Sequence, residues 1–201
     1  MQSFVKAFAL LLVLAGPAFA QASPNQSRIR GEVTAVNGDM LSVKTPEGTE
    51  TSVKLASGYS VGGVVKATTA DIRKGGYIGV GARPQADGSL LAVQVFIFPE
   101  AMRGTAEGHR PWGVLPDTTM TNATVADTVS RVDGANLVLN YPGGEQKVTI
   151  TPDANIIMAA PAETAELKPG AQVAMTATKQ SDGSLSASRI TIAKPGAQLP
   201  Y

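Results

Sequence analysis

The chain has no cysteine, and it has one histidine and one tryptophan among 201 residues. Without cysteine there are no disulfides, no thiol catalysis and no thiolate metal sites. A single histidine also excludes most of the nucleophile–base pairs that hydrolases use. Stability therefore has to come from apolar cores, and we expect no enzymatic activity.

The chain also has no large excess of either sign of charge, because it has 17 Lys and Arg residues and 16 Asp and Glu residues. This balance argues against nucleic acid as a partner, since nucleic acid selects basic surfaces. It argues equally against a polybasic patch for anionic membranes. We expect a partner that is an envelope protein or a small ligand.

Long apolar runs are scarce, and the longest lies at residues 7–15. It is too short to cross a bilayer, which takes roughly 20 apolar residues. Lys6 precedes the run, and the small-x-small sequence Ala18-Phe19-Ala20 follows it. This order predicts a cleavable signal peptide over residues 1–20, a periplasmic location and no membrane span.

The rest of the chain is an internal repeat with a shift of 95 or 96 positions. Residues 33–48 match residues 129–144, and the sequence Asp-Gly-Ser-Leu occurs at both 87–90 and 182–185. So many coincidences in register predict a duplicated unit.

Each copy has the pattern of antiparallel strands. Apolar and polar residues alternate, and Asn-Gly or Asp-Gly pairs mark tight hairpin turns. The segments after the third strand, 57–75 and 151–170, are predicted to be irregular, with at most one short helical turn near 70–73 or 163–167. The predicted strands are 29–36, 40–46, 50–56, 76–83 and 89–98, then 124–132, 136–141, 145–150, 171–178 and 185–193.

Five such strands in about 70 residues, with a cap between the third and fourth, predict an OB-like small barrel. An open sandwich is the alternative. A doubly wound parallel sheet is excluded because no amphipathic helix of sufficient length occurs. The fold class is therefore all-β, with two tandem five-stranded OB-like barrels after a helical signal peptide. The predicted segments are a signal peptide (1–20), a flexible N-terminus (21–28), a first OB-like domain (29–99), an interdomain linker (100–123), a second OB-like domain (124–194) and a C-terminal tail (195–201).

The motif G-x-V-x-x-V-x-G-x-x-L-x-V, followed by D-I/L-K/R-x-G and D-G-S-L-x-A, lies in residues 31–48, 71–75 and 87–92. It resembles an uncharacterised bacterial family of exported OB-like β domains. The second copy departs from it at Asp127 and Glu166. The resemblance implies a fold and a compartment but no activity.

The linker sequence, at 98–104 and 108–112, looks like that of a narrower two-copy subgroup. Some members of that subgroup carry transferred names that mention metal ABC transporter permeases. A permease role is physically excluded here because no spanning helix is present.

The linker also holds the single histidine, His109, and the single tryptophan, Trp112, together with Met102 and Met120. Thioether sulfur and imidazole nitrogen suit monovalent copper or silver, and an indole face can approach a cation. This composition is similar to that of the periplasmic copper-binding chaperone of efflux systems, but the order and spacing differ, so no site is carried over. The alternative is that Met102 and Trp112 pack between the barrels.

Charged linker residues, Arg103, Glu107 and Arg110, are candidates for contact with a partner, although a solvated ion-pair cluster is their ordinary role. Three acids precede glycines, where turn geometry explains them. We therefore expect a non-enzymatic periplasmic binding or scaffold protein without a resident cofactor. The second hypothesis is soft-metal binding through the linker, and a carboxylate hydrolase ranks last.

Overall fold

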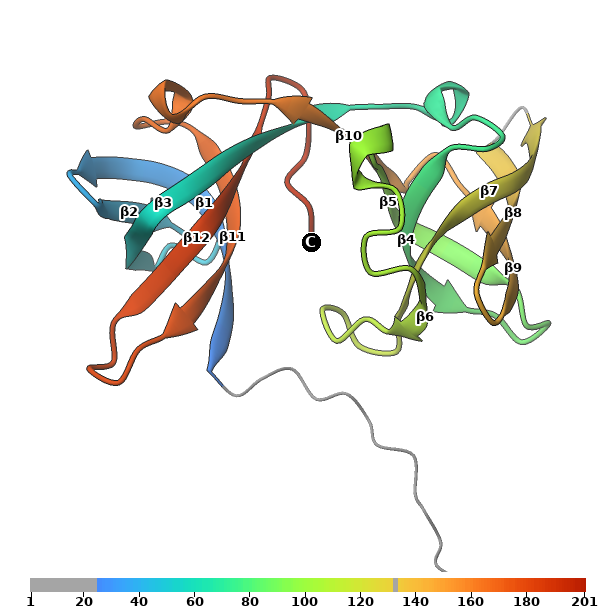
Figure 1. Ribbon diagram of the computed structural model, residues 1–201, viewed down its shortest axis with the longest axis horizontal. Helices are drawn as coiled ribbons and strands as arrows, with labels where there is room; N and C mark the ends of the chain where they lie inside the picture. The colour runs from blue at the N-terminus through green and yellow to red at the C-terminus, as the bar shows by residue number, and fades with distance from the viewer. Residues whose placement is uncertain (1–24, 132–133) are drawn as a thin grey trace, which may run out of the picture.

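The structure, a computed structural model, describes residues 25–131 and 134–201 (Figure 1). Three single-turn 3-10 helices, η1 (Thr69–Asp71), η2 (Glu100–Met102) and η3 (Thr164–Glu166), are its only helical elements in these ranges. The strands are β1 (Gln26–Asn37), β2 (Met40–Lys44), β3 (Glu50–Lys66), β4 (Tyr77–Pro84), β5 (Leu90–Ile97), β6 (Gly108–Pro111), β7 (Thr119–Arg131), β8 (Gly134–Tyr141), β9 (Gly144–Ile150), β10 (Asn155–Pro161), β11 (Gln172–Lys179) and β12 (Leu185–Ala193). The expected all-β class is confirmed.

Several boundaries differ from the prediction. The predicted signal peptide, 1–20, lies outside the described residues. Strand β1 begins at Gln26, inside the segment predicted to be flexible, because residues 26–32 pair with β11. The predicted linker is also partly regular: β6 pairs with the start of β7, at residues 108–111 and 119–122.

The strand pairings close two rings. Strands β1, β2, β3, β12 and β11 form one ring, which we call the terminal barrel. Strands β4, β5, β9, β8 and β7 form the other, which we call the central barrel. In Figure 1 the terminal barrel lies on the left and the central barrel on the right.

These rings do not follow the two sequence copies. Strands β4 and β5 belong to the first copy, yet they pair with β7 and β9 of the second. Strands β11 and β12 of the second copy pair with β1 and β3 of the first. The expected tandem grouping, 29–99 and 124–194, is therefore replaced by an exchange of the last two strands of each copy, as in domain swapping.

The exchange depends on the two segments that were predicted to be irregular. Strand β3 continues through Lys66, and β10 pairs with it in antiparallel register from Ile157↔Lys66 to Pro161↔Gly62. Strand β10 also pairs in parallel with β5. We call this paired part of β3 and β10 the bridge. These segments were predicted to be irregular, but β-branched residues and a partner strand make them extended.

Each barrel has its own core, and each core draws on both copies. Val80 and Val95 of the first copy pack in the central core with Leu137 of the second. Val33 and Leu41 pack in the terminal core with second-copy residues such as Ile190. Within the described ranges, no helix is long and apolar enough to cross a bilayer.

Candidate functional site

The C-terminal tail, residues 195–201, runs between the two barrels (Figure 1). It begins after Lys194, whose Nζ donates a hydrogen bond to Glu166 of η3. This bond is the largest cause of a lowered pKa for Glu166, and a hydrogen bond from the Glu163 main chain is the second. The tail is thus held at its start by an ion pair of the terminal barrel.

Side chains from both barrels and from the start of β10 bind the main chain of the tail. The Arg30 guanidinium and the Asn155 amide both donate to the Leu199 carbonyl, at 3.2 and 3.3 Å. The Tyr201 amide donates to Gln94 Oε1 at 2.8 Å. We call this set, with Trp112 described below, the inter-barrel site.

Strand alternation explains why these side chains face the tail. Gln94 points away from the central core because its neighbour Val95 points into it. Gln94 and Asn155 are nevertheless buried, with 4% and 9% of their surface exposed. Buried amides need hydrogen-bond partners, and here the tail supplies one for each.

Trp112 forms the aromatic wall of the site. Its ring lies flat against Gly81, where a Cβ would stand only 2.4 Å from the indole Cζ3. The indole also meets the Tyr201 ring edge-on at a centroid distance of 6.2 Å, and the Arg30 guanidinium lies 5.1 Å from the same Tyr201 ring. Glycine is required at position 81 because any side chain would displace Trp112.

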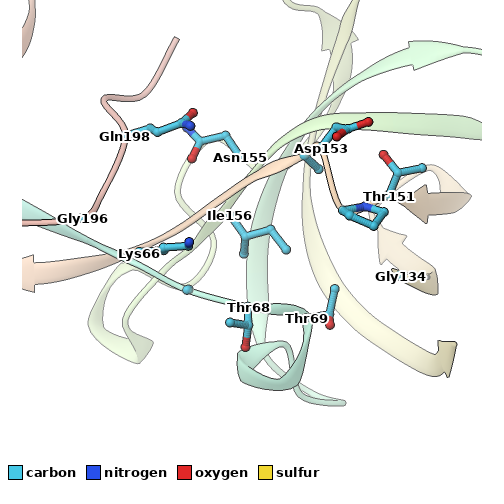
Figure 2. Close-up of a pocket in the computed structure, with 13 residues that line it drawn as sticks. Lys66, Thr68, Thr69, Gly134, Thr151, Asp153, Asn155, Ile156, Gly196 and Gln198 are labelled. Carbon is cyan, nitrogen blue, oxygen red and sulfur yellow. The ribbon is translucent and has the colours of Figure 1, made fainter. Parts of the chain in front are cut away.

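A polar pocket of about 630 Å³ opens beside the tail. Figure 2 shows Asn155 next to Gln198 of the tail, with Lys66 on the neighbouring strand and Thr68 and Thr69 farther along the same segment. The lining is hydrophilic and comes from the bridge, from the turn before β10 and from the tail. This pocket therefore extends the inter-barrel site with groups that solvate polar atoms.

The four candidate metal residues do not share one face. His109 lies opposite Thr121 in the ladder between β6 and β7, and its Nδ1 is 2.8 Å from the Thr121 hydroxyl. Met120 immediately precedes Thr121 in β7, so its side chain points to the other face of the strand. Met120 pairs there with Gly81, against which Trp112 packs. Soft-metal binding by these residues stays a prediction.

Met102 lies on the same side of the central barrel as Phe96, and both line an apolar groove of about 750 Å³. His109 instead stacks near Tyr141, with ring centroids 6.2 Å apart. No group of three or more His, Asp or Glu side chains able to hold a metal occurs in the described ranges.

The candidate partner residues of the linker mostly hold the linker itself. Arg103 bonds Glu100 at 2.5 and 2.7 Å and donates to the Gly75 carbonyl at 2.8 Å. Arg110 donates to the Ala106 carbonyl at 2.8 Å. Glu107 is exposed. The contact of Arg103 with Gly75 fastens the linker to the central barrel, as does the Tyr77 hydroxyl, which donates to the Thr105 carbonyl at 3.0 Å.

Two of the three turn acids, Asp87 and Asp182, have the local role that was predicted for them, and the third, Asp133, lies outside the described residues. Asp87 accepts hydrogen bonds from the amide and hydroxyl of Ser89, and Asp182 does the same with Ser184. These bonds lower the pKa of both carboxyls, the side-chain bond being the larger cause.

Arg30, Gln94, Asn155 and Tyr201 were not singled out from the sequence. One signal was available for Gln94, which is the only polar residue in the otherwise apolar strand β5. The other three have no motif, because they meet only when the two barrels and the tail are assembled.

Comparison with known proteins gives one family match. Residues 128–191 match the model of a domain of unknown function, DUF5666. No curated protein and no solved structure matches the chain. The matched segment is nearly the whole second sequence copy, so its strands contribute to both barrels. This match is consistent with the uncharacterised family that the sequence resembles.

Proposed function

We propose that this chain is an exported, non-enzymatic binding protein. The inter-barrel site would hold an extended, proline-containing segment of another envelope polypeptide. The signal-peptide pattern at residues 1–20 supports export. The first copy is proposed as a second, diverged OB-like unit of the family matched by residues 128–191, because residues 33–48 repeat the pattern of 129–144.

One observation carries the proposal: buried amide side chains bind main-chain atoms of the tail. Gln94 and Asn155 contact the Tyr201 amide and the Leu199 carbonyl, which every polypeptide presents. Recognition of this kind is independent of the ligand's side chains, and it is how binding domains hold extended peptides. The tail then occupies a site that a partner segment of similar backbone can enter.

The chemistry of the tail indicates which segment fits. Pro200 has a fixed φ, and a residue before proline, here Leu199, favours extended backbone. Tyr201 adds an aromatic contact with Trp112 and a cation–π contact with Arg30. The preferred ligand is therefore an extended segment with proline followed by an aromatic residue.

The single tryptophan makes a direct test possible. A chain that ends at residue 197 lacks the Tyr201 contact, so the emission of Trp112 should shift to longer wavelength. A peptide with the sequence Ala-Gln-Leu-Pro-Tyr should reverse the shift when it is added in trans. Because a tethered segment has an effective concentration of about millimolar, we expect reversal at millimolar peptide.

Matched variants make the test specific. In the shortened chain, Gln94→Ala should weaken peptide binding, whereas Tyr141→Phe should not, because Tyr141 packs against the central core and near His109. A peptide ending in Ala in place of Tyr should bind more weakly. If the peptide leaves Trp112 emission unchanged at millimolar concentration in a folded chain, the proposal is wrong.

A further inference from the structure

The apolar groove beside the tail is a second, separate feature of the space between the barrels. Its volume is about 750 Å³, within the range of small-molecule sites. All residues of the tail are described, and none of them lines it. The groove is therefore open while the inter-barrel site is occupied.

The floor of the groove is flat because small residues share one face of the bridge. Gly62 pairs with Pro161 and Val64 pairs with Ala159 in the antiparallel ladder, so Gly62 and Ala159 lie on the same face. Phe96 joins that face through the parallel pair Ile157↔Phe96. An unbranched apolar chain can lie along such a floor and bury its surface.

The charge at the edge of the groove has one sign. Arg189 is the only charged residue among those that line it, and it also lines an adjoining pocket of about 340 Å³ together with Arg28 and Arg30. No acid lines either space.

The arginines are poorly compensated within the molecule. The ion pairs of the described residues use Lys54, Lys74, Arg103 and Lys194, and none uses these three arginines. Arg30 Nε is buried and has no hydrogen-bond partner in the described part of the chain. The pKa of the Arg28 guanidinium is lowered, mainly by partial burial and secondly by the charge of Arg30. An anion at this edge would relieve the repulsion between the guanidinium groups.

We propose that this groove binds a single-chain carboxylate amphiphile of the fatty-acid type. The hydrocarbon chain would lie on the Gly62 and Ala159 floor against Phe96, and the carboxylate would meet Arg189. Burial of the chain supplies the hydrophobic contribution. The guanidinium fork matches a carboxylate, which gives a charge-assisted contact. This proposal goes beyond the peptide site and does not depend on it.

Gly62 offers a way to block the groove without disturbing the bridge. A Cβ at Gly62 meets no atom within 4 Å, whereas a Cβ at the neighbouring Gly63 would stand 2.9 Å from Lys194 Cε and 3.0 Å from the Ala160 carbonyl oxygen. Gly62→Leu should therefore fold normally and fill the floor. Met158→Ala is a matched control, because Met158 is exposed on the opposite face of β10.

The experiment is calorimetric titration of residues 21–201 with dodecanoate below its micelle concentration, with dodecanol below its solubility limit, and with butyrate. We expect saturable one-to-one binding of dodecanoate. Dodecanol, which lacks the charge, should bind about fivefold more weakly, as expected for a partly exposed ion pair. Butyrate, which lacks the chain, should give no saturable heat.

The variants then locate the site. Gly62→Leu should abolish dodecanoate binding, Arg189→Gln should weaken it about fivefold, and Met158→Ala should leave it unchanged. Equal binding of dodecanol and dodecanoate by the wild type overturns the proposal, as does wild-type affinity in a folded Gly62→Leu chain. If Gly62→Leu does not fold, Arg189→Gln decides, because its side chain is on the surface.

Discussion

The two barrels have the same strand order but are built from different lengths of chain. The central barrel is contiguous, with its buried core contained in residues 67–150. The terminal barrel joins β1–β3 to β11 and β12, so the whole central barrel lies between its two parts. The contact order of the terminal barrel is therefore higher, and closing it costs more chain entropy.

The surfaces that the two barrels turn toward each other also differ. The linker covers the central barrel, with Trp112 against Gly81 and Tyr77 bonded to Thr105. The terminal barrel presents arginines and is covered by the tail at Arg30. The same repeat thus gives one face that the linker covers and one that the tail contacts beside a pocket lined by arginines.

The largest expected effect comes from cutting the chain along the two alternative boundaries. Residues 67–156 alone should fold as a monomer with a cooperative thermal transition, because they contain every strand of the central barrel. Residues 29–99, the first sequence copy, should associate or stay unfolded, because β1 and β3 lose β11 and β12. Circular dichroism and analytical ultracentrifugation measure both outcomes. A folded monomer of residues 29–99 would show that the sequence copy is the folding unit.

Equivalent leucines test whether the barrels unfold separately. Leu41 and Leu137 occupy the same position of the repeat and are 0% and 1% exposed. Truncating either to Ala should lower the free energy of unfolding by about 2–5 kcal/mol. In urea titrations, Leu137→Ala should shift the Trp112 transition strongly, whereas Leu41→Ala should shift mainly the circular dichroism signal. Equal shifts of the Trp112 transition would mean that the molecule unfolds as one unit.

A smaller effect is expected from glycines on the two facing surfaces. Gly81→Ala places a Cβ against the indole and should destabilise the central barrel by about 1–3 kcal/mol. It should also shift Trp112 emission to longer wavelength. Gly62→Ala meets open space and should change stability by less than about 0.5 kcal/mol. If both variants have the same melting temperature, Trp112 does not pack on Gly81 in solution.

The smallest effect concerns the single histidine, which belongs to the central barrel. The pKa of His109 is lowered below its ordinary value of 6.5, mainly by burial and secondly by the charge of Arg110. The folded state then favours neutral imidazole, so this stabilisation is present above pH 6.5 and is lost as the pH falls through the folded pKa. NMR titration of the ring should give a midpoint below 6.5, and Arg110→Gln should raise it. A wild-type midpoint at or above 6.5 contradicts this account.

The sequence predicted the strands well where alternation and turn chemistry agreed. Asp87-Gly88 and Asp182-Gly183 lie in turns before strands, as expected, and buried Leu41 and Leu137 mark the same strand of each copy. Prediction failed at residues 57–66 and 155–161, because their partner strands lie far away in the chain; residues 62–66 and 157–161, for example, pair with each other across about 95 residues. Local propensity carries no information about such a partner.

The candidate site could be predicted only in part. Trp112 was singled out as a soft-metal candidate, with packing between the barrels as the alternative, and it packs on Gly81 at the inter-barrel site. Arg30, Asn155 and Tyr201 were missed because each is an ordinary residue of a strand or a tail. Their relation depends on how the barrels are placed, and periodicity within one strand does not encode that placement.

The sequence by itself determined the all-β class, the duplication and the reliance on apolar cores, because these follow from composition, period-two alternation and turn residues. Only the tertiary structure decided which copy supplies which strands. Both groupings bury the same apolar faces, so the hydrophobic pattern alone does not distinguish them. In the exchanged arrangement β3 and β10 pair in the bridge, and the tail, the inter-barrel site and the groove come together.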